Sequence, residues 1–214
     1  YYYRVYNTGT TTLTDKTILT CVQDFQNDDC PGAVELIPQS DFIYTSGLLY
    51  GATKSNTGLT SPCLKSTTQD VWYKFKAANE TQFIFAQGNG NYYPEMEVYS
   101  GNCGSLSNLK CISSNSKKED SLKLKNLSIG STYYVRIWNS YPTAPSIFHN
   151  ILIGNPPVND DCSNAILLKS NQFLCSSSED GIGNFATQSL NGVLSGTADD
   201  DLWYTFTADT SVHF

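Results

Sequence analysis

The chain has few of the groups that bind nucleic acids or membranes. Only 13 of its 214 residues are Lys or Arg, against 20 Asp or Glu, so the formal net charge is −7 at pH 7. A surface with this charge repels phosphate backbones and anionic lipid headgroups. No apolar run approaches the roughly 18 residues of a membrane-spanning helix. We therefore expect neither nucleic-acid binding nor membrane insertion.

Catalytic motifs are also missing. Histidine occurs only as His149 and His213, and the chain contains no Gly-x-Ser-x-Gly, His-Glu-x-x-His or glycine-rich phosphate loop. Glu95 and Glu97 could imitate a carboxylate pair, but their i, i+2 spacing puts both on one side of a strand. We expect that side to face solvent. The sequence predicts that this segment is not an enzyme.

The seven cysteines never form a Cys-x-x-Cys pair. This spacing argues against structural zinc and against a thioredoxin-like redox site. We interpret the cysteines as disulfide-forming, which predicts an extracellular or cell-surface protein. Their odd number leaves one thiol over, and for Cys21 we expect a partner outside this sequence.

The four cysteines between residues 27 and 153 allow three pairings. We favour Cys103 with Cys111, which would close a loop around Gly104–Lys110. That choice leaves Cys30 to pair with Cys63, which would tie the first segment to the loop before residue 70.

Abundant residues are those of β-structure: 13% of the chain is aromatic, with 14 Tyr, and there are 15 Gly. Apolar residues alternate with polar ones in several short stretches, the period of a half-buried strand. In 70–76, for example, we expect Val71, Tyr73 and Phe75 to enter a core while Trp72 faces water or a neighbour. We expect further strands at 82–87 and 95–99, and helix only as a turn near 31–36.

Three landmarks recur at one spacing. Asn27-Asp28-Asp29-Cys30 returns as Asn159-Asp160-Asp161-Cys162, an offset of 159 − 27 = 132. The stretch 70–77 returns at 201–208, offset 131, and 1–7 matches 133–139, offset 132. Such a period indicates a tandem array.

The spacing divides the chain into three parts. We expect residues 1–22 to be the last strands of a preceding copy, 27–153 a complete copy, and 159–214 the first half of a following copy. The fold prediction is all-β, with tandem jelly-roll-like antiparallel β-sandwiches. Because Leu194 stands where Cys63 would recur, we expect Cys162 to pair with Cys175.

Oxygen-rich side chains repeat at the start of each copy and before its Trp-Tyr strand. Calcium takes six to eight such oxygens, so these residues predict a calcium site. The alternative is that Asn and Asp bind backbone groups of a turn, which requires no metal. The candidate metal ligands are Asn27, Asp28, Asp29, Asp70, Asn159, Asp160, Asp161 and Asp201.

Four aromatic residues near predicted loops, or on the polar face of a strand, are candidates for binding sugars or peptides. They are Tyr92, Tyr93, Trp138 and Tyr141. The alternative is that they cover the second face of a sheet or contact a neighbouring copy.

Together, the Asn-Asp-Asp-Cys motif at 27–30, Asp-Val-Trp-Tyr-Lys-Phe at 70–75, Glu-Val-Tyr-Ser-Gly-Asn-Cys-Gly at 97–104 and Thr-Tyr-Tyr-Val-Arg-Ile at 132–137 resemble pre-peptidase C-terminal-like repeats. These repeats occur in secreted and surface proteins of Bacteroidota. The resemblance implies a jelly-roll sandwich exported by type IX secretion. Related collagen-binding modules bind calcium through acidic residues near the domain start. The resemblance therefore implies calcium at most at Asn27, Asp28 and Asp29 and at their copies.

Two functions follow as hypotheses. The first is a structural stalk, filament or adhesin of the cell surface, in which neighbouring copies are the main partners. The second is an accessory module of a secreted hydrolase that binds carbohydrate or protein. Surface glycans and proteins are the expected external partners.

Overall fold

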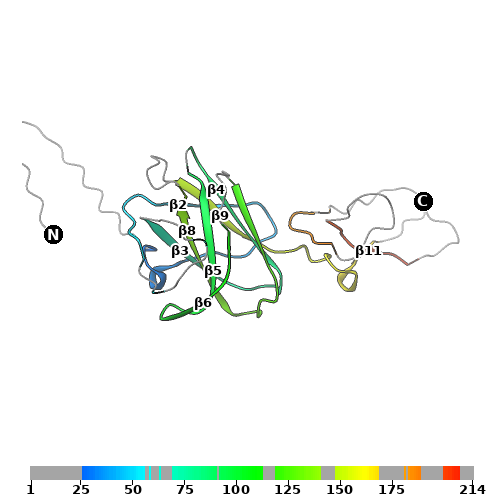
Figure 1. Ribbon diagram of the computed structural model, residues 1–214. Coiled ribbons are helices and arrows are strands. Elements are labelled where there is room, and N and C mark those ends of the chain that lie inside the picture. The colour runs from blue at the N-terminus through cyan, green and yellow to red at the C-terminus, as the bar shows by residue number, and fades with distance from the viewer. Residues whose placement is uncertain are drawn as a thin grey trace, which may run out of the picture.

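The computed structural model describes residues 26–55, 58, 63, 69–90, 92–112, 119–140, 148–168, 181, 183–188 and 200–207. Within them, two β-sheets pack face to face as a sandwich (Figure 1). The larger sheet has the order β1 (Val34–Glu35), β3 (Asp70–Lys76), β8 (Thr132–Asn139), β5 (Pro94–Asn102) and β6 (Ser105–Ile112). The smaller has the order β2 (Thr45–Leu48), β9 (Phe148–Gly154), β4 (Gln82–Gly88) and β7 (Glu119–Leu124).

The strand order is that of a jelly roll. Strands β2 to β9 distribute between the sheets as β2-β9-β4-β7 and β3-β8-β5-β6, and every neighbouring pair among them is antiparallel. Two such sheets wound from Greek keys define the jelly-roll architecture. The short β1 adds to the edge of β3 in parallel. The prediction of an all-β sandwich is confirmed.

A second, smaller set of elements follows residue 158. The 3₁₀ turn η2 (Cys162–Asn164) leads into β10 (Ile166–Leu167), which pairs in parallel with β11 (Tyr204–Thr205). This small sheet lies beyond one end of the sandwich (Figure 1). The predicted partial copy at 1–22 lies outside the described residues.

The core between the two sheets is built from alternate residues. Val71, Tyr73 and Phe75 of β3 point inward, and Ile84 of β4 and Ile151 of β9 belong to the same buried cluster. Fully burying a side chain of this size contributes about 1.5–3 kcal/mol. The predicted alternation is therefore confirmed for the inward face. No helix in the described part of the chain is long and apolar enough to cross a membrane.

Part of the opposite face of the five-stranded sheet is buried as well, contrary to prediction. Trp72 is fully buried, packed in a second cluster with Tyr99 and Leu106. The 3₁₀ turn η1 (Cys30–Gly32) and Ala33 supply the cover, since Cys30 and Ala33 belong to the same cluster. Residues 30–33 thus form a third layer, the covering layer, over Trp72 of β3 and Tyr99 of β5.

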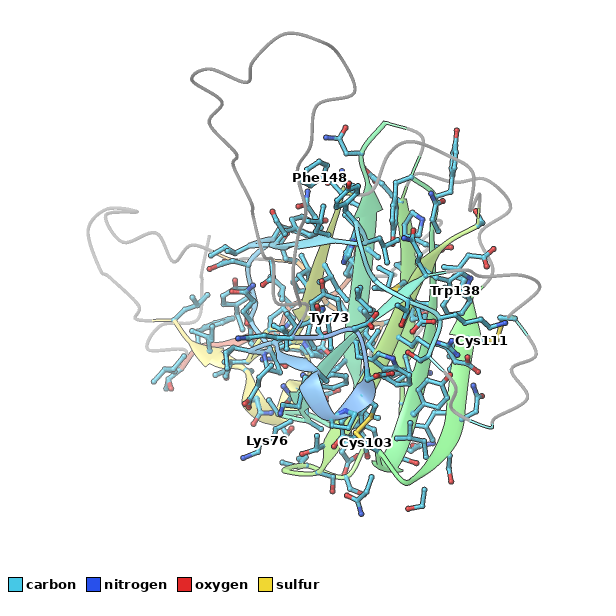
Figure 2. The ribbon with its side chains drawn as sticks, turned by 90° about the vertical axis from the view of Figure 1, so that its left-hand side faces the viewer. Tyr73, Lys76, Cys103, Cys111, Trp138 and Phe148 are labelled. Carbon is cyan, nitrogen blue, oxygen red and sulfur yellow. A yellow bond between two sulfur atoms is a disulfide. The ribbon has the colours of Figure 1, made fainter. Side chains whose placement is uncertain are left out.

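The favoured disulfide pairing is wrong. The bonds join Cys30 to Cys103 and Cys63 to Cys111, with Cα–Cα distances of 5.6 and 6.1 Å. Residues 105–112 form an extended strand, which places Cys103 and Cys111 roughly 20–25 Å apart along the chain direction at about 3.3 Å per residue. Figure 2 shows these two cysteines well separated. A disulfide needs Cα atoms within about 7 Å, so the short loop that we expected cannot close.

The Cys30–Cys103 bond attaches the covering layer to the turn between β5 and β6, and the Cys63–Cys111 bond attaches the segment before β3 to β6. They close loops spanning 73 and 48 residues. On the chain-entropy model, loops of this size each stabilise by about 4 kcal/mol. Cys162 is exposed and joined to no described cysteine. Cys175 lies outside the described residues, so its pairing with Cys162 stays a prediction.

The helical turn is shorter than expected and is capped differently. It spans Cys30–Gly32 only, and the preceding Asp29 makes no side-chain capping hydrogen bond. The carboxylate of Asp28 reaches across to another loop instead, as described below.

Candidate functional site

Asp28, which precedes the first strand of the sandwich, holds a distant loop. Asp28 Oδ1 accepts a hydrogen bond from the backbone N of Thr53 at 2.5 Å, and Asp28 Oδ2 accepts one from Thr53 Oγ1 at 2.8 Å. Both carboxylate oxygens therefore have protein partners. This is the hydrogen-bonding alternative to calcium, although the partner is 25 residues away.

Asp70, the fourth predicted metal ligand of this copy, lies in a buried ion pair. Arg136 Nη2 is 2.6 Å from Asp70 Oδ2, and both side chains are at most 1% exposed. Ser55 also donates to Asp70, from its backbone N at 3.1 Å and from its hydroxyl. Burial by itself lowers the pKa of Arg136, but the hydrogen bond and charge of Asp70 outweigh it and the net shift is upward. Asp70 therefore neutralises a buried cation.

The described residues contain no group of three or more His, Cys, Asp and Glu side chains that could hold a metal ion. The carboxylate oxygens of Asp28 and Asp70 already have protein partners. Asp29 and Asp161 are exposed, and Asp201 is half-buried. Calcium at these positions stays a prediction.

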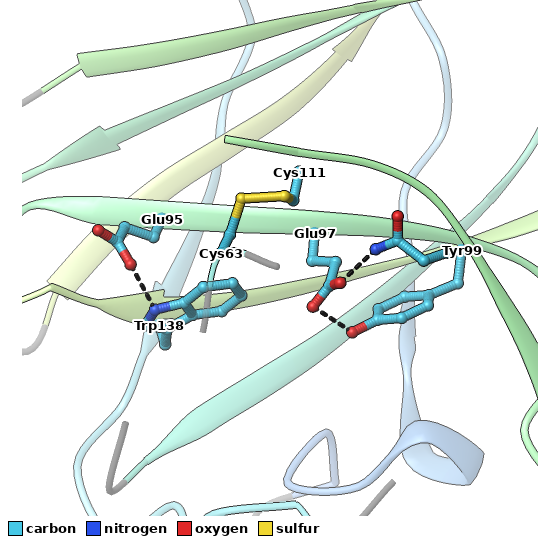
Figure 3. Close-up of a disulfide and its surroundings, with 7 residues drawn as sticks. Cys63, Glu95, Glu97, Tyr99, Cys111 and Trp138 are labelled. Atoms are coloured by element: carbon cyan, nitrogen blue, oxygen red, sulfur yellow. Dashed lines mark hydrogen bonds between the residues drawn. A yellow bond between two sulfur atoms is a disulfide. The ribbon is translucent and has the colours of Figure 1, made fainter. Parts of the chain in front are cut away.

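Glu95 and Glu97 are buried, which corrects their expected exposure. Glu97 Oε2 accepts a hydrogen bond from Tyr99 Oη at 2.5 Å, and Glu97 Oε1 accepts one from Asn108 Nδ2. Glu95 Oε2 accepts one from Trp138 Nε1 at 2.7 Å. Figure 3 shows both groups of contacts beside the Cys63–Cys111 disulfide. Burial, followed by the hydrogen bond and charge of Glu97, raises the pKa of Tyr99.

The polar network therefore lies beneath the covering layer. Trp72 Nε1 donates to Ser55 Oγ at 2.7 Å, and the guanidinium carbon of Arg136 lies 5.7 and 5.9 Å from the ring centroids of Trp72 and Trp138. At these distances a cation is attracted by an aromatic face. Because aromatic rings and disulfides enclose the network, we interpret its role as stabilising the fold.

Two of the four predicted ligand-binding aromatics are inaccessible. Trp138 is 1% exposed and Tyr92 is fully buried. Tyr92 stacks on His149, with a centroid distance of 5.3 Å. Tyr93 is half-buried, and Tyr141 lies outside the described residues. The alternative, that aromatics cover the second face of a sheet, is correct for Trp138.

His149 forms a small buried site that the sequence did not reveal. Its Nε2 lies 2.8 Å from Tyr73 Oη, and its Nδ1 has no hydrogen-bond partner among the described residues. Burial lowers the pKa of His149 from 6.5 to about 3 and raises the pKa of Tyr73. The imidazole is therefore neutral and fixed in the core.

An accessible groove lies between the edges of β6 and β7. It is lined mainly by polar and basic side chains, including Lys110, Lys123, Lys125 and Asn126. Lys110 Nζ donates to the backbone O of Lys123 at 2.9 Å across the two edges. This groove has room for a polar ligand.

The sequence could have signalled the buried network. Trp72 and Trp138 stand at nominally solvent-facing positions of β3 and β8, and large aromatics there indicate a second covered face. Asp70 and Arg136 lie on that same face, because Asp70 pairs with Trp138 and Trp72 pairs with Arg136 in the ladder. Nothing in the local pattern points to Ser55.

Comparison with known proteins identifies the family. A family model described as galactose binding domain-like, and associated with type IX secretion, matches residues 26–151. That is 151 − 26 + 1 = 126 of the 214 residues, more than half of the chain. The chain belongs to this galactose-binding-like family. Its match confirms the predicted resemblance to β-sandwich modules of type IX secretion substrates.

One solved structure similar to this galactose-binding-like module is the 1.0 Å crystal structure of the pre-peptidase C-terminal domain of collagenase from Bacillus anthracis. It is 8% identical, with a TM-score of 0.35, over 56% of this chain and 95% of that one. A search of the curated proteins finds no match. Family membership and two disulfides indicate an extracellular module. Galactose-binding-like modules are non-catalytic.

Proposed function

We propose that the chain is part of a tandem-repeat protein in which consecutive galactose-binding-like modules form a stalk, filament or adhesin at the cell surface. One observation carries the proposal. Several contacts at the start of the first module, residues 27–36, recur in residues 159–168, which follow a connector at 155–158.

The acidic contact is the most specific of these. Asp160 Oδ1 accepts a hydrogen bond from the backbone N of Thr187 at 2.5 Å, and Asp160 Oδ2 accepts one from Thr187 Oγ1 at 2.8 Å. Asp28 and Thr53 make the same two bonds at 2.5 and 2.8 Å. A carboxylate that binds both the amide and the hydroxyl of one threonine is a repeated architectural element, which supports a second copy.

The backbone repeats as well. Trp72 N donates to Asn27 O at 2.8 Å, and Trp203 N donates to Asn159 O at 2.8 Å. The parallel pairing of Val34 with Tyr73 is matched by that of Ile166 with Tyr204. Because 27–36 and 159–168 each add a parallel edge to a Trp-Tyr strand, they occupy the same place in their modules.

Small-angle scattering of three consecutive modules tests the stalk. We expect a maximum dimension close to the sum of three module lengths, with a cross-section that matches one sandwich. A compact or freely jointed particle would contradict the proposal. The second candidate function, described next, would then be favoured.

The second candidate is an accessory binding module of a secreted hydrolase, with carbohydrate or protein as ligand. The description of the family as galactose-binding-like favours a sugar, and the groove of Lys110, Lys123 and Asn126 offers polar side chains. Titration with galactose, followed by amide NMR shifts, tests it. Shifts confined to the groove and abolished in Asn126→Ala would support binding, whereas no shifts at millimolar sugar would exclude galactose.

A further inference from the structure

The outer face of the four-stranded sheet carries an apolar patch formed by β4 and β9. Phe83 and Phe85 of β4 point away from the core, because Ile84 and Ala86 between them are the core residues. In the ladder, Phe83 pairs with Gly154 and Phe85 with Leu152. These four residues therefore share the outer face.

This outer face is covered. Leu152 is 1% exposed although it lies on the side opposite to the core residues Ile151 and Ile153. An outward leucine in a two-layer sandwich would be accessible to water unless another segment packed on it. Two segments pack on this face: Phe42, before β2, has its ring centroid 5.7 Å from that of Phe85, and a second aromatic residue comes from beyond residue 158.

Phe185 is the aromatic residue from beyond residue 158. Its ring centroid lies 4.6 Å from that of Phe42, 5.3 Å from that of Phe85 and 5.9 Å from that of Phe83. A Cβ placed on Gly154 would come within 2.8–2.9 Å of the Phe185 ring, so the ring rests directly on the backbone of β9. Phe185 itself is 7% exposed.

The backbone of Phe185 has an unfavourable conformation in this position. Its φ is +62°, and a bulky side chain in the left-handed region is uncommon and unfavourable. The corresponding residue of the first module is Gly51, which also stands two residues before the threonine bound by the acidic residue and has φ +83°. The same turn follows both: Ala52 N donates to Leu49 O at 3.0 Å, and Ala186 N to Gly183 O at 3.1 Å.

A glycine would suit this turn better than phenylalanine if only the turn mattered. The aromatic ring must therefore gain something outside its own turn, and what it contacts is the sheet of the preceding module. The first residue of the connector, Asn155, is also fixed to the sandwich. Its backbone N donates to Gln39 O at 2.8 Å, and its Oδ1 accepts a hydrogen bond from Gln82 Nε2 at 2.6 Å.

We propose that Phe185 is a docking anchor, through which the following module binds the outer face of the β2-β9-β4-β7 sheet and fixes the angle of the joint. The partner of this surface is the next copy of the same repeat, and the inference rests on the proposed tandem arrangement. The first module has Gly51 at the anchor position and offers no ring there. Joints in such an array are therefore of two kinds, those with an aromatic anchor and those without one.

Hydroxyl-radical footprinting of the full chain tests the anchor. Oxidation of Phe42, Phe83 and Phe85 is measured in the wild type, in Phe185→Ala and in Phe185→Gly. The glycine variant removes the ring while relieving the left-handed strain, so it separates docking from folding of the turn. Phe148→Ala is the matched control, because Phe148 is an exposed aromatic on the same sheet, 56% accessible, at the opposite end of β9.

We expect a several-fold rise in oxidation at Phe83 and Phe85 in both Phe185 variants and no rise in the control. Unchanged oxidation in the Phe185 variants, or an equal rise in Phe148→Ala, would overturn the anchor. Hydrogen exchange at the Thr187 amide is followed in the same samples. Protection there tests the second copy independently, so a failed anchor and a failed repeat give different results.

Discussion

Mild acid should destabilise this protein through one residue, His149. The imidazole is neutral in the folded state because it is fully buried, with Tyr73 at Nε2 and the Tyr92 ring stacked on it. Its pKa falls from 6.5 to about 3 on folding. Between pH 6.5 and pH 3, His149 therefore binds a proton in the unfolded chain but not in the folded chain. Stability is fully present above pH 6.5 and is lost as the pH falls from 6.5 toward 3.

The size of the effect follows from the linkage relation. In this window a single site changes the free energy of unfolding by about 1.4 kcal/mol per pH unit. Between pH 7 and pH 5 the loss is about 2 kcal/mol, because the unfolded histidine is only partly protonated near its own pKa. Above pH 5 most carboxylates remain ionised, so the histidine contribution can be measured separately from theirs.

Urea unfolding under non-reducing conditions, followed by the fluorescence of Trp72 and Trp138, measures this loss. His149→Gln is the test variant, because an amide can hydrogen-bond Tyr73 and does not titrate. We expect its free energy of unfolding to be nearly constant from pH 7 to pH 5, whatever its value at pH 7. If wild type and variant lose stability in parallel, or if wild type loses none, the assignment of acid sensitivity to His149 is wrong.

Three further predictions concern the covering layer and the acidic motif. Replacing Cys63 and Cys111 by Ser should lower the free energy of unfolding by up to about 4 kcal/mol, measured by urea unfolding; a native Cys103–Cys111 peptide in mass mapping would contradict the pairing. Arg136→Ala leaves a buried carboxylate without its cation and should cost about 3–5 kcal/mol in the same assay, whereas a cost below about 1 kcal/mol would mean that the pair is solvated. Asp28→Ala removes two hydrogen bonds and should cost about 1–3 kcal/mol with or without calcium; a chelator that lowers the thermal midpoint of the wild type but not of the variant would show that Asp28 binds calcium.

Local patterns predicted the elements of the fold better than its layers. Alternation over 70–76 and 132–137 is enough to place β3 and β8, because period two is a property of each strand alone. It says nothing of what lies on the second face. Trp72 was expected to face water because covering it depends on residues 30–33, about 40 positions earlier in the chain.

The disulfides and the buried network were out of reach for the same reason. We paired Cys103 with Cys111 because they are close in sequence. The extended strand β6 between them keeps the two cysteines far apart in space. Asp70 meets Arg136 only after β3 and β8 have paired. Acidic residues near a module start suggest a metal when their partners are unknown, and the threonine that binds Asp28 is visible only in three dimensions.

The proposed repeat could be inferred from sequence alone, because it rests on motifs that recur at one spacing. The contact of Phe185 with the outer face of β4 and β9, on which the proposed docking rests, could not be predicted, since Phe185 stands in a stretch with no strong match to the first copy. In the proposed anchor, phenylalanine stands at the position that Gly51 occupies in the first module.

The central claim is that consecutive modules are joined at a fixed angle, and an intramolecular distance distribution tests it most directly. Nitroxide labels at Ser107 and Asn164, both exposed, report one position on the sandwich and one beyond the connector. Pulsed electron paramagnetic resonance should give a single narrow distribution in the wild type and a broader one in Phe185→Ala. A broad distribution in the wild type would contradict the account.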